Sequence, residues 1–332
     1  MRGALKVILA LVGVAALAWF LLHADLREIW RTCLSLGWTA PVLFIPYLLV
    51  YLADTLGWWF CFRPPPPYLT LMRIRWAGEA VNNVLPSAYL GGEALKIYSL
   101  GKRGIPAAQS APAAVVSKTV QTLAQVMCIA LGGLAFVSLG VAPPVFQKAM
   151  VGVFFAGIAV VGGLFWLQRH GVFGFFFAVI RRLRWRAEAW KHRESTWRQF
   201  DQDIREFYVS QRGRFLVSCA AYLAGWLLDA AEIYLAAYLL AVPLSIAQAV
   251  AIETFVSVAK ALSIFIPGAL GVQESSVVFL CRMAGVPDSF GFTYAVLRRA
   301  RELIFVLIGW GWLCLEETTM RGLAQRVKAG SV

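Results

Sequence analysis

The stretch from Glu79 to Gln121 has a second copy further along the chain, at a constant offset of 181 positions. At this offset, without a gap, Pro86 aligns with Pro267 and Glu93 with Glu274. The other informative matches are Gly104 with Gly285, Pro106 with Pro287, Glu79 with Lys260, Lys118 with Arg299, and Gln121 with Glu302. Because an internal duplication constrains the whole architecture, we predict a fold built from two related halves.

The chain is too apolar for a water-soluble protein. Of its 332 residues, 60% are hydrophobic and 15% are charged, whereas soluble domains have roughly 45–50% and 25%. We therefore predict an all-α polytopic membrane protein, with one integral membrane domain over residues 1–332. Six apolar runs are candidate spanning helices: 4–22, 38–62, 107–139, 146–167, 215–242 and 290–315.

The excess of basic residues indicates a membrane surface as partner. The formal net charge is +13, but the cations gather between the apolar runs, as in cytoplasmic loops of membrane proteins. Residues 168–214 form the main basic segment, and its blocks 181–186 and 197–208 have an amphipathic pattern that favours the cytoplasmic leaflet. We expect anionic lipids as partners and no nucleic acid.

The cysteines and histidines give no sign of a metal or a disulfide framework. The six cysteines are scattered without a short paired spacing, and the three histidines lie near span ends or in a loop. We expect no cofactor and no metal site.

Two further segments are apolar but carry charges, and each ends at a proline. Residues 69–85 contain Glu79, Asn82 and Asn83 and stop before Pro86. A charge at the bilayer centre costs roughly 2.5–3.5 kcal/mol on insertion scales, so a lipid-facing helix is unfavourable there. We predict that this segment and residues 246–266, which end at Pro267, are re-entrant half-helices that turn back inside the protein.

The order of the spans gives the two copies opposite orientations. With both termini cytoplasmic, the first re-entrant segment enters from the inner side and the second from the outer side. The prediction is an inverted repeat, 38–139 and 215–315, of the kind found in transporters whose broken helices meet near the midplane. We place the protein in the cell inner membrane.

The candidate substrate site is the set of polar residues around the two breaks. Helix N-termini at such breaks favour anions, and arginine suits a bidentate grip on phosphate. The predicted set contains Glu79, Asn82, Asn83, Pro86, Gly91, Gly92, Glu93, Lys96, Lys118, Gln121, Glu253, Lys260, Pro267, Gly268, Gly271, Gln273, Glu274, Arg298, Arg299, Arg301 and Glu302.

Structural roles are the alternative for these residues. The polar side chains near Pro86 would satisfy freed backbone groups, Glu93 and Glu274 would cap helices, and the basic residues would snorkel to the interface. Asp54, Asp229 and Glu232 have no match at the common offset and stay outside the predicted site.

The same residues resemble a known family. The run from Gly78 to Lys96, followed by residues 115–118, resembles the first signature of the flippase-like membrane family that includes the transmembrane part of lysylphosphatidylglycerol synthase. Residues 265–274 and 297–302 resemble its second signature. The residues of both signatures are most similar to the branch of the family associated with hopanoid biosynthesis. The resemblance implies transfer of a polar-headgroup or hopanoid-type lipid between leaflets.

Two other functions stay open at this point. One is a membrane-embedded transferase acting on lipid or polyprenyl-phosphate headgroups, with paired carboxylates as acid and base. The other is a scaffold subunit that holds lipid-biosynthesis enzymes through the basic segment. We favour a lipid transporter that is not an enzyme, and homo-oligomers are compatible with the sequence.

Overall fold

The computed structural model describes residues 36–84, 90–140, 144–171 and 194–328, together with residues 27, 30, 31 and 34. Over these ranges the secondary structure is entirely helical, as predicted. The elements in chain order are η1 (Gly37–Leu43), α3 (Phe44–Trp59), α4 (Tyr68–Val84), α5 (Leu90–Gly101), α6 (Ala107–Leu139), α7 (Pro144–His170), α10 (Glu194–Ser210), α11 (Arg212–Leu239), α12 (Ile246–Leu262), η2 (Pro267–Ala269), α13 (Val272–Met283) and α14 (Asp288–Lys328).

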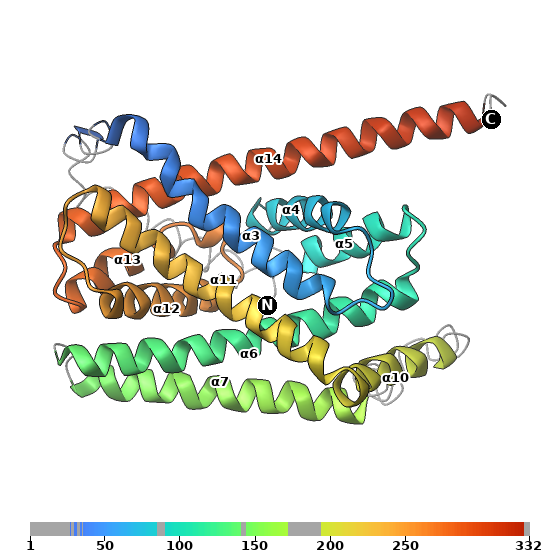
Figure 1. The fold of residues 1–332 in the computed structure, drawn as a ribbon, viewed down its shortest axis with the longest axis horizontal. Coiled ribbons are helices and arrows are strands. Elements are labelled where there is room, and N and C mark those ends of the chain that lie inside the picture. Colours follow the sequence, from blue (N-terminus) through green and yellow to red (C-terminus); the bar gives the residue numbers. More distant parts are fainter. Residues whose placement is uncertain are drawn as a thin grey trace, which may run out of the picture.

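Four helical stretches within the described residues are long and apolar enough to cross a membrane: Gly37–Trp59, Ala107–Leu139, Gln147–Gln168 and Arg212–Leu239. They correspond to four of the six predicted spans, so the protein is a polytopic helical membrane protein. The predicted span 4–22 lies outside the described residues. The last predicted span lies within α14, which runs along the molecule (Figure 1).

Two short helical hairpins occupy the middle of the bundle. The first hairpin is α4 with α5, and the second is α12 with η2 and α13. Figure 1 shows them reaching inward from opposite ends of the long axis, α4 and α5 from one end and α12 and α13 from the other. Their inner ends meet, because η2 packs against α4 and a Cβ on Gly268 would lie 3.4 Å from the Asn83 carbonyl oxygen. Neither hairpin crosses the molecule as an ordinary pair of spanning helices.

The duplicated sequence has the same backbone conformation where each hairpin ends. The Ile105 N–H donates to Leu100 O at 3.1 Å, and the Val286 N–H, 181 positions later, donates to Cys281 O at 2.8 Å. Both turns contain a glycine with positive φ, 82° at Gly104 and 75° at Gly285, a conformation that other residues rarely adopt. The repeat is thus visible in the hydrogen bonds of both turns, while the predicted domain limits 38–139 and 215–315 stay predictions.

Each hairpin packs against the long helix of the other repeat. Helix α4 lies along α14, and α12 lies along α6. Both contacts are close: a Cβ on Gly309 would lie 2.6 Å from the Ala80 Cβ, and a Cβ on Gly132 would lie 2.6 Å from the Thr254 Cβ. Small residues allow such an approach of helix backbones in a membrane. The crossed packing couples the position of each hairpin to the opposite repeat.

Replacing Gly309 with alanine should therefore destabilise the protein. The new methyl group meets Ala80 and the Trp76 carbonyl, 2.8 Å away, so α4 has to move; overpacking of this kind costs about 1–3 kcal/mol. The matched control is Gly311→Ala, two residues along the same helix, where a Cβ meets nothing within 4 Å. Thermal unfolding in detergent should show a lower midpoint for Gly309→Ala alone. Equal midpoints for the two variants would contradict the packing.

Helix α10 corrects one prediction about the basic segment. The amphipathic block 197–208 was expected to lie on the lipid leaflet, but its apolar residues Phe200, Ile204 and Phe207 are buried in the protein, with α10 against α6, α7 and α11. The amphipathic pattern was correct, but the surface that it covers is protein instead of lipid. The other block, 181–186, lies outside the described residues.

Candidate functional site

The first hairpin carries a buried cluster of charges. The Lys96 ammonium donates to Glu79 Oε1 at 3.0 Å and to Glu93 Oε1 at 2.9 Å, and it is only 3% exposed. Lys118, on α6, reaches the same Glu93 oxygen at 3.1 Å. Two acids on the hairpin are therefore neutralised by one cation from the hairpin and one from a long helix.

Two residues outside the predicted site, Arg75 and Asp54, extend this cluster. Arg75 Nη2 lies 2.7 Å from Asp54 Oδ2, and both residues are buried. The Gln121 amide donates to the same Asp54 oxygen at 3.3 Å. Arg75 precedes Glu79 by one helical turn and lies 3.9 Å from it, so its i, i+4 spacing was the signal available in the sequence.

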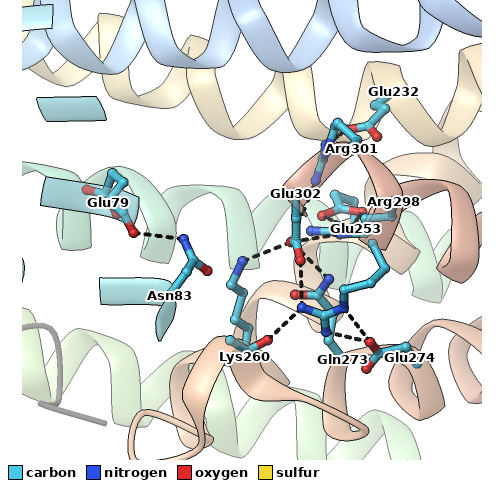
Figure 2. Close-up of polar contacts among 12 residues, drawn as sticks. Glu79, Asn83, Glu232, Glu253, Lys260, Gln273, Glu274, Arg298, Arg301 and Glu302 are labelled. Atoms are coloured by element: carbon cyan, nitrogen blue, oxygen red, sulfur yellow. Dashed lines mark hydrogen bonds and ion pairs between the residues drawn. The ribbon is translucent and has the colours of Figure 1, made fainter. Parts of the chain in front are cut away.

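The second hairpin carries a cluster of its own (Figure 2). Arg299 Nε donates to Glu274 Oε1 at 2.6 Å, and its Nη1 donates to Glu302 Oε2 at 2.9 Å. Lys260 Nζ and the Gln273 amide both donate to Glu302 Oε1, at 3.2 and 3.0 Å. Figure 2 shows Lys260 of α12 and Gln273 of α13 meeting at Glu302 of α14.

Two further ion pairs anchor α14 beside this cluster. Arg298 Nη1 lies 2.6 Å from a Glu253 oxygen, and both side chains are almost fully buried. Arg301 pairs with Glu232 on α11 and stacks over the Tyr47 ring, 3.5 Å from its centroid. Both arginines are bound inside the protein and do not snorkel to an interface. Glu232, which lies outside the predicted site, is one of these partners.

The two clusters share one motif at the offset of the repeat. Glu93 pairs with Lys118, and Glu274 pairs with Arg299 at 2.5 Å. The cation in each copy also donates to the residue three positions later, Lys118 to Gln121 at 3.2 Å and Arg299 to Glu302. We call these the equivalent ion pairs. Glu93 and Glu274 thus lie in two separate clusters, each bound to the basic residue of its own repeat.

The polar residues near the breaks also hold the backbone. Asn82 Oδ1 accepts from the Gly92 N–H at 2.8 Å, and Asn83 donates to the Glu79 carbonyl at 2.9 Å. These contacts fit the structural alternative. Pro86 lies outside the described residues, and Gly91 lies in the first turn of α5.

Glu274 has a structural role as well as a charged partner. Its Oε2 accepts from the Gly271 N–H at 2.8 Å and so caps α13. Arg299 meanwhile donates to the Gly268 carbonyl at 3.1 Å, one residue beyond Pro267. The second break is therefore held directly by the equivalent ion pair of its repeat.

The arrangement suits anion exchange at a cation. Each equivalent ion pair joins a carboxylate to a lysine or arginine, and a phosphate can replace the carboxylate with the same kind of charge-assisted hydrogen bond. The side chain of Lys118 is 41% exposed and that of Arg299 is 18% exposed, so the first pair is the more accessible. Within the described ranges, no group of three or more His, Cys, Asp or Glu side chains could hold a metal ion.

The fold and its buried charges define a class, that of polytopic helical membrane proteins with two opposed helical hairpins. Residues 4–309 match the family described as the lysylphosphatidylglycerol synthase TM region, and the chain belongs to this family. Neither a comparison with curated proteins nor one with solved structures gives a match. The hopanoid-associated branch stays a prediction.

Proposed function

We propose that this protein moves a lipid with an anionic headgroup between the leaflets of the inner membrane, and that both termini are cytoplasmic. The observation that carries the proposal is the pair of equivalent ion pairs, one on each of two hairpins that enter from opposite ends. Such broken helices surround the substrate in inverted-repeat transporters. The name of the family refers to a synthase of a modified phospholipid, and a lipid substrate agrees with it.

In the proposed mechanism, a headgroup phosphate takes the place of a carboxylate. It displaces Glu93 from Lys118, while Glu93 keeps its bond to Lys96. At the second cluster, a phosphate on Arg299 would leave Glu274 bound to the Gly271 N–H. Neither displaced carboxylate is left without a partner, so the free-energy cost of exchange is low compared with that of burying an unpaired charge.

Lipid transfer in vesicles tests the proposal. The full chain is reconstituted into liposomes that contain a fluorescent phospholipid, and a membrane-impermeant quencher reports the lipid in the outer leaflet over time. We expect the inner-leaflet fraction to become accessible faster than in protein-free vesicles. Transfer no faster than in empty vesicles, across phosphatidylglycerol, phosphatidylethanolamine and hopanoid probes, would contradict it.

The scaffold alternative requires a partner enzyme to bind to α10. The apolar face of this helix is already covered by the bundle, so a partner has to bind its polar face. A transferase would instead form a modified lipid when the purified protein receives lipid and a donor. The transport assay contains neither a donor substrate nor a partner enzyme. Lipid transfer between leaflets in that assay therefore does not depend on transferase or scaffold activity.

A further inference from the structure

Two residues that line the same small cavity beside the first cluster each have a buried N–H group without a hydrogen-bond partner. These groups are the indole Nε1 of Trp58 and the Nη1 of Arg75. Trp58 is 3% exposed and Arg75 is 7% exposed, so solvent does not satisfy these groups. A buried donor left unpaired is unfavourable, and two of them at one cavity indicate a missing acceptor.

Several of the acceptors at this cavity are already in use. Glu93 Oε1 accepts from Lys96 and Lys118, and the Gln121 side-chain oxygen accepts from Lys118. The remaining lining hydroxyls, Ser117 and Tyr222, are hydrogen-bonded to each other at 2.5 Å. The two unpartnered N–H groups, on Trp58 and Arg75, therefore still lack an acceptor.

The cavity is the size of one oxygen atom and has a positive rim. Its volume is about 10 Å³, close to the minimum for a single water-sized occupant. Lys96 and Lys118 both line it, and Lys118 is the cation with the most exposed side chain in either cluster. An oxyanion there would accept from the unpartnered donors and be attracted by the two lysines, whereas a water molecule carries no charge.

We propose that this cavity receives one non-ester oxygen of a phosphate group, with Trp58 and Arg75 as donors, and that the phosphate belongs to a lipid headgroup. The inference deepens the proposed function and rests on it for the choice of a lipid over free phosphate. In this arrangement Arg75 Nη2 still donates to Asp54, and the unpartnered Nη1 donates to the phosphate oxygen. Lys118 turns from Glu93 to a second oxygen of the same group.

Binding of a short-chain lipid to the purified full chain in non-ionic detergent tests this inference without requiring transport. The probes are dihexanoylphosphatidylglycerol and dihexanoylglycerol, which lacks the phosphate. Trp58→Phe should raise the Kd of the phosphate probe about tenfold, because one charge-assisted hydrogen bond is lost. The unfolding midpoint of this variant should equal that of the unchanged protein. Arg75→Lys, which keeps a positive charge beside Asp54, should also weaken the binding of the phosphate probe.

The matched control is Trp312→Phe. The Trp312 Nε1 is also buried without a partner but does not line this cavity, so its loss should leave the Kd unchanged. An unchanged Kd in Trp58→Phe, or equal binding of the two probes, would overturn the inference and leave a cavity for water only. Inorganic phosphate that competes as well as the lipid would overturn the lipid assignment. Trp58-dependent binding in a protein that transfers no lipid would overturn the proposed function alone.

Discussion

Lys118→Gln is expected to slow lipid transfer about tenfold or more while the protein stays folded. Lys118 is the accessible half of the first equivalent ion pair, and its replacement removes a charge-assisted hydrogen bond of about 1.5–3 kcal/mol to the proposed headgroup. Glu93 keeps Lys96 at 2.9 Å, so no buried carboxylate is left unpaired. Initial transfer rates in proteoliposomes and unfolding midpoints in detergent measure the two effects.

The other repeat supplies the conservative variant. Arg299 stands at the position equivalent to Lys118, so Lys118→Arg should keep most of the transfer. Lys102→Gln is the control for charge, because Lys102 is exposed and contacts the Tyr98 ring at 4.5 Å, away from the clusters. Full transfer by Lys118→Gln, or the same loss in Lys102→Gln, would remove Lys118 from the mechanism.

Arg298→Leu is expected to have the largest effect on stability. The Arg298 and Glu253 side chains are 5% and 3% exposed, so loss of the arginine leaves a carboxylate buried without the Nη1 group that donates to both of its oxygens. Breaking a buried pair in this way costs about 3–5 kcal/mol, which corresponds to a fall in the unfolding midpoint on the order of 10 °C. Thermal unfolding of the purified protein followed by size-exclusion chromatography gives the measurement.

The double variant separates a charge effect from a packing effect. Glu253→Leu with Arg298→Leu removes both charges together, and hydrophobic replacement of a buried pair is often neutral or stabilising. We expect the double variant to regain most of the lost stability. A double variant as unstable as Arg298→Leu alone would show that the contribution of Arg298 does not come from its pairing with Glu253.

The offset of 181 positions predicted more of the structure than any single segment did. It aligned Glu93 and Lys118 with Glu274 and Arg299, and both pairs are in contact. It also aligned the two glycine turns that end the hairpins. Proline, glycine and charge patterns could give this information because they encode local geometry, which both copies repeat.

Contacts between segments far apart in the chain could not be read in this way. Asp54 pairs with Arg75, and Glu232 pairs with Arg301, but these acids have no counterpart at the offset. The apolar face of α10 likewise carried no sign of whether protein or lipid would cover it. An amphipathic pattern gives the direction of a face and not the identity of its partner.

The separation into two clusters is the main difference between the expected and the observed site. One shared set of charges was predicted around a headgroup, whereas the structure distributes them over the two hairpins with an ion pair in each. The common offset aligned the two acids with each other and the two basic residues with each other, but it carried no distance between the two hairpins. Because the clusters lie on opposed hairpins, the natural hypothesis is that a lipid phosphate passes from one cluster to the other.

The central claim is that the two hairpins enter from opposite faces of the membrane. Single cysteines at Lys102, after α5, and at Ser289, at the start of α14, test it in a cysteine-free background, because both positions are exposed. A membrane-impermeant maleimide should label Ser289→Cys from the outside of intact cells and Lys102→Cys only in inverted membrane vesicles. Labelling of both positions from the same side would contradict the opposed hairpins and, with them, the proposed transport.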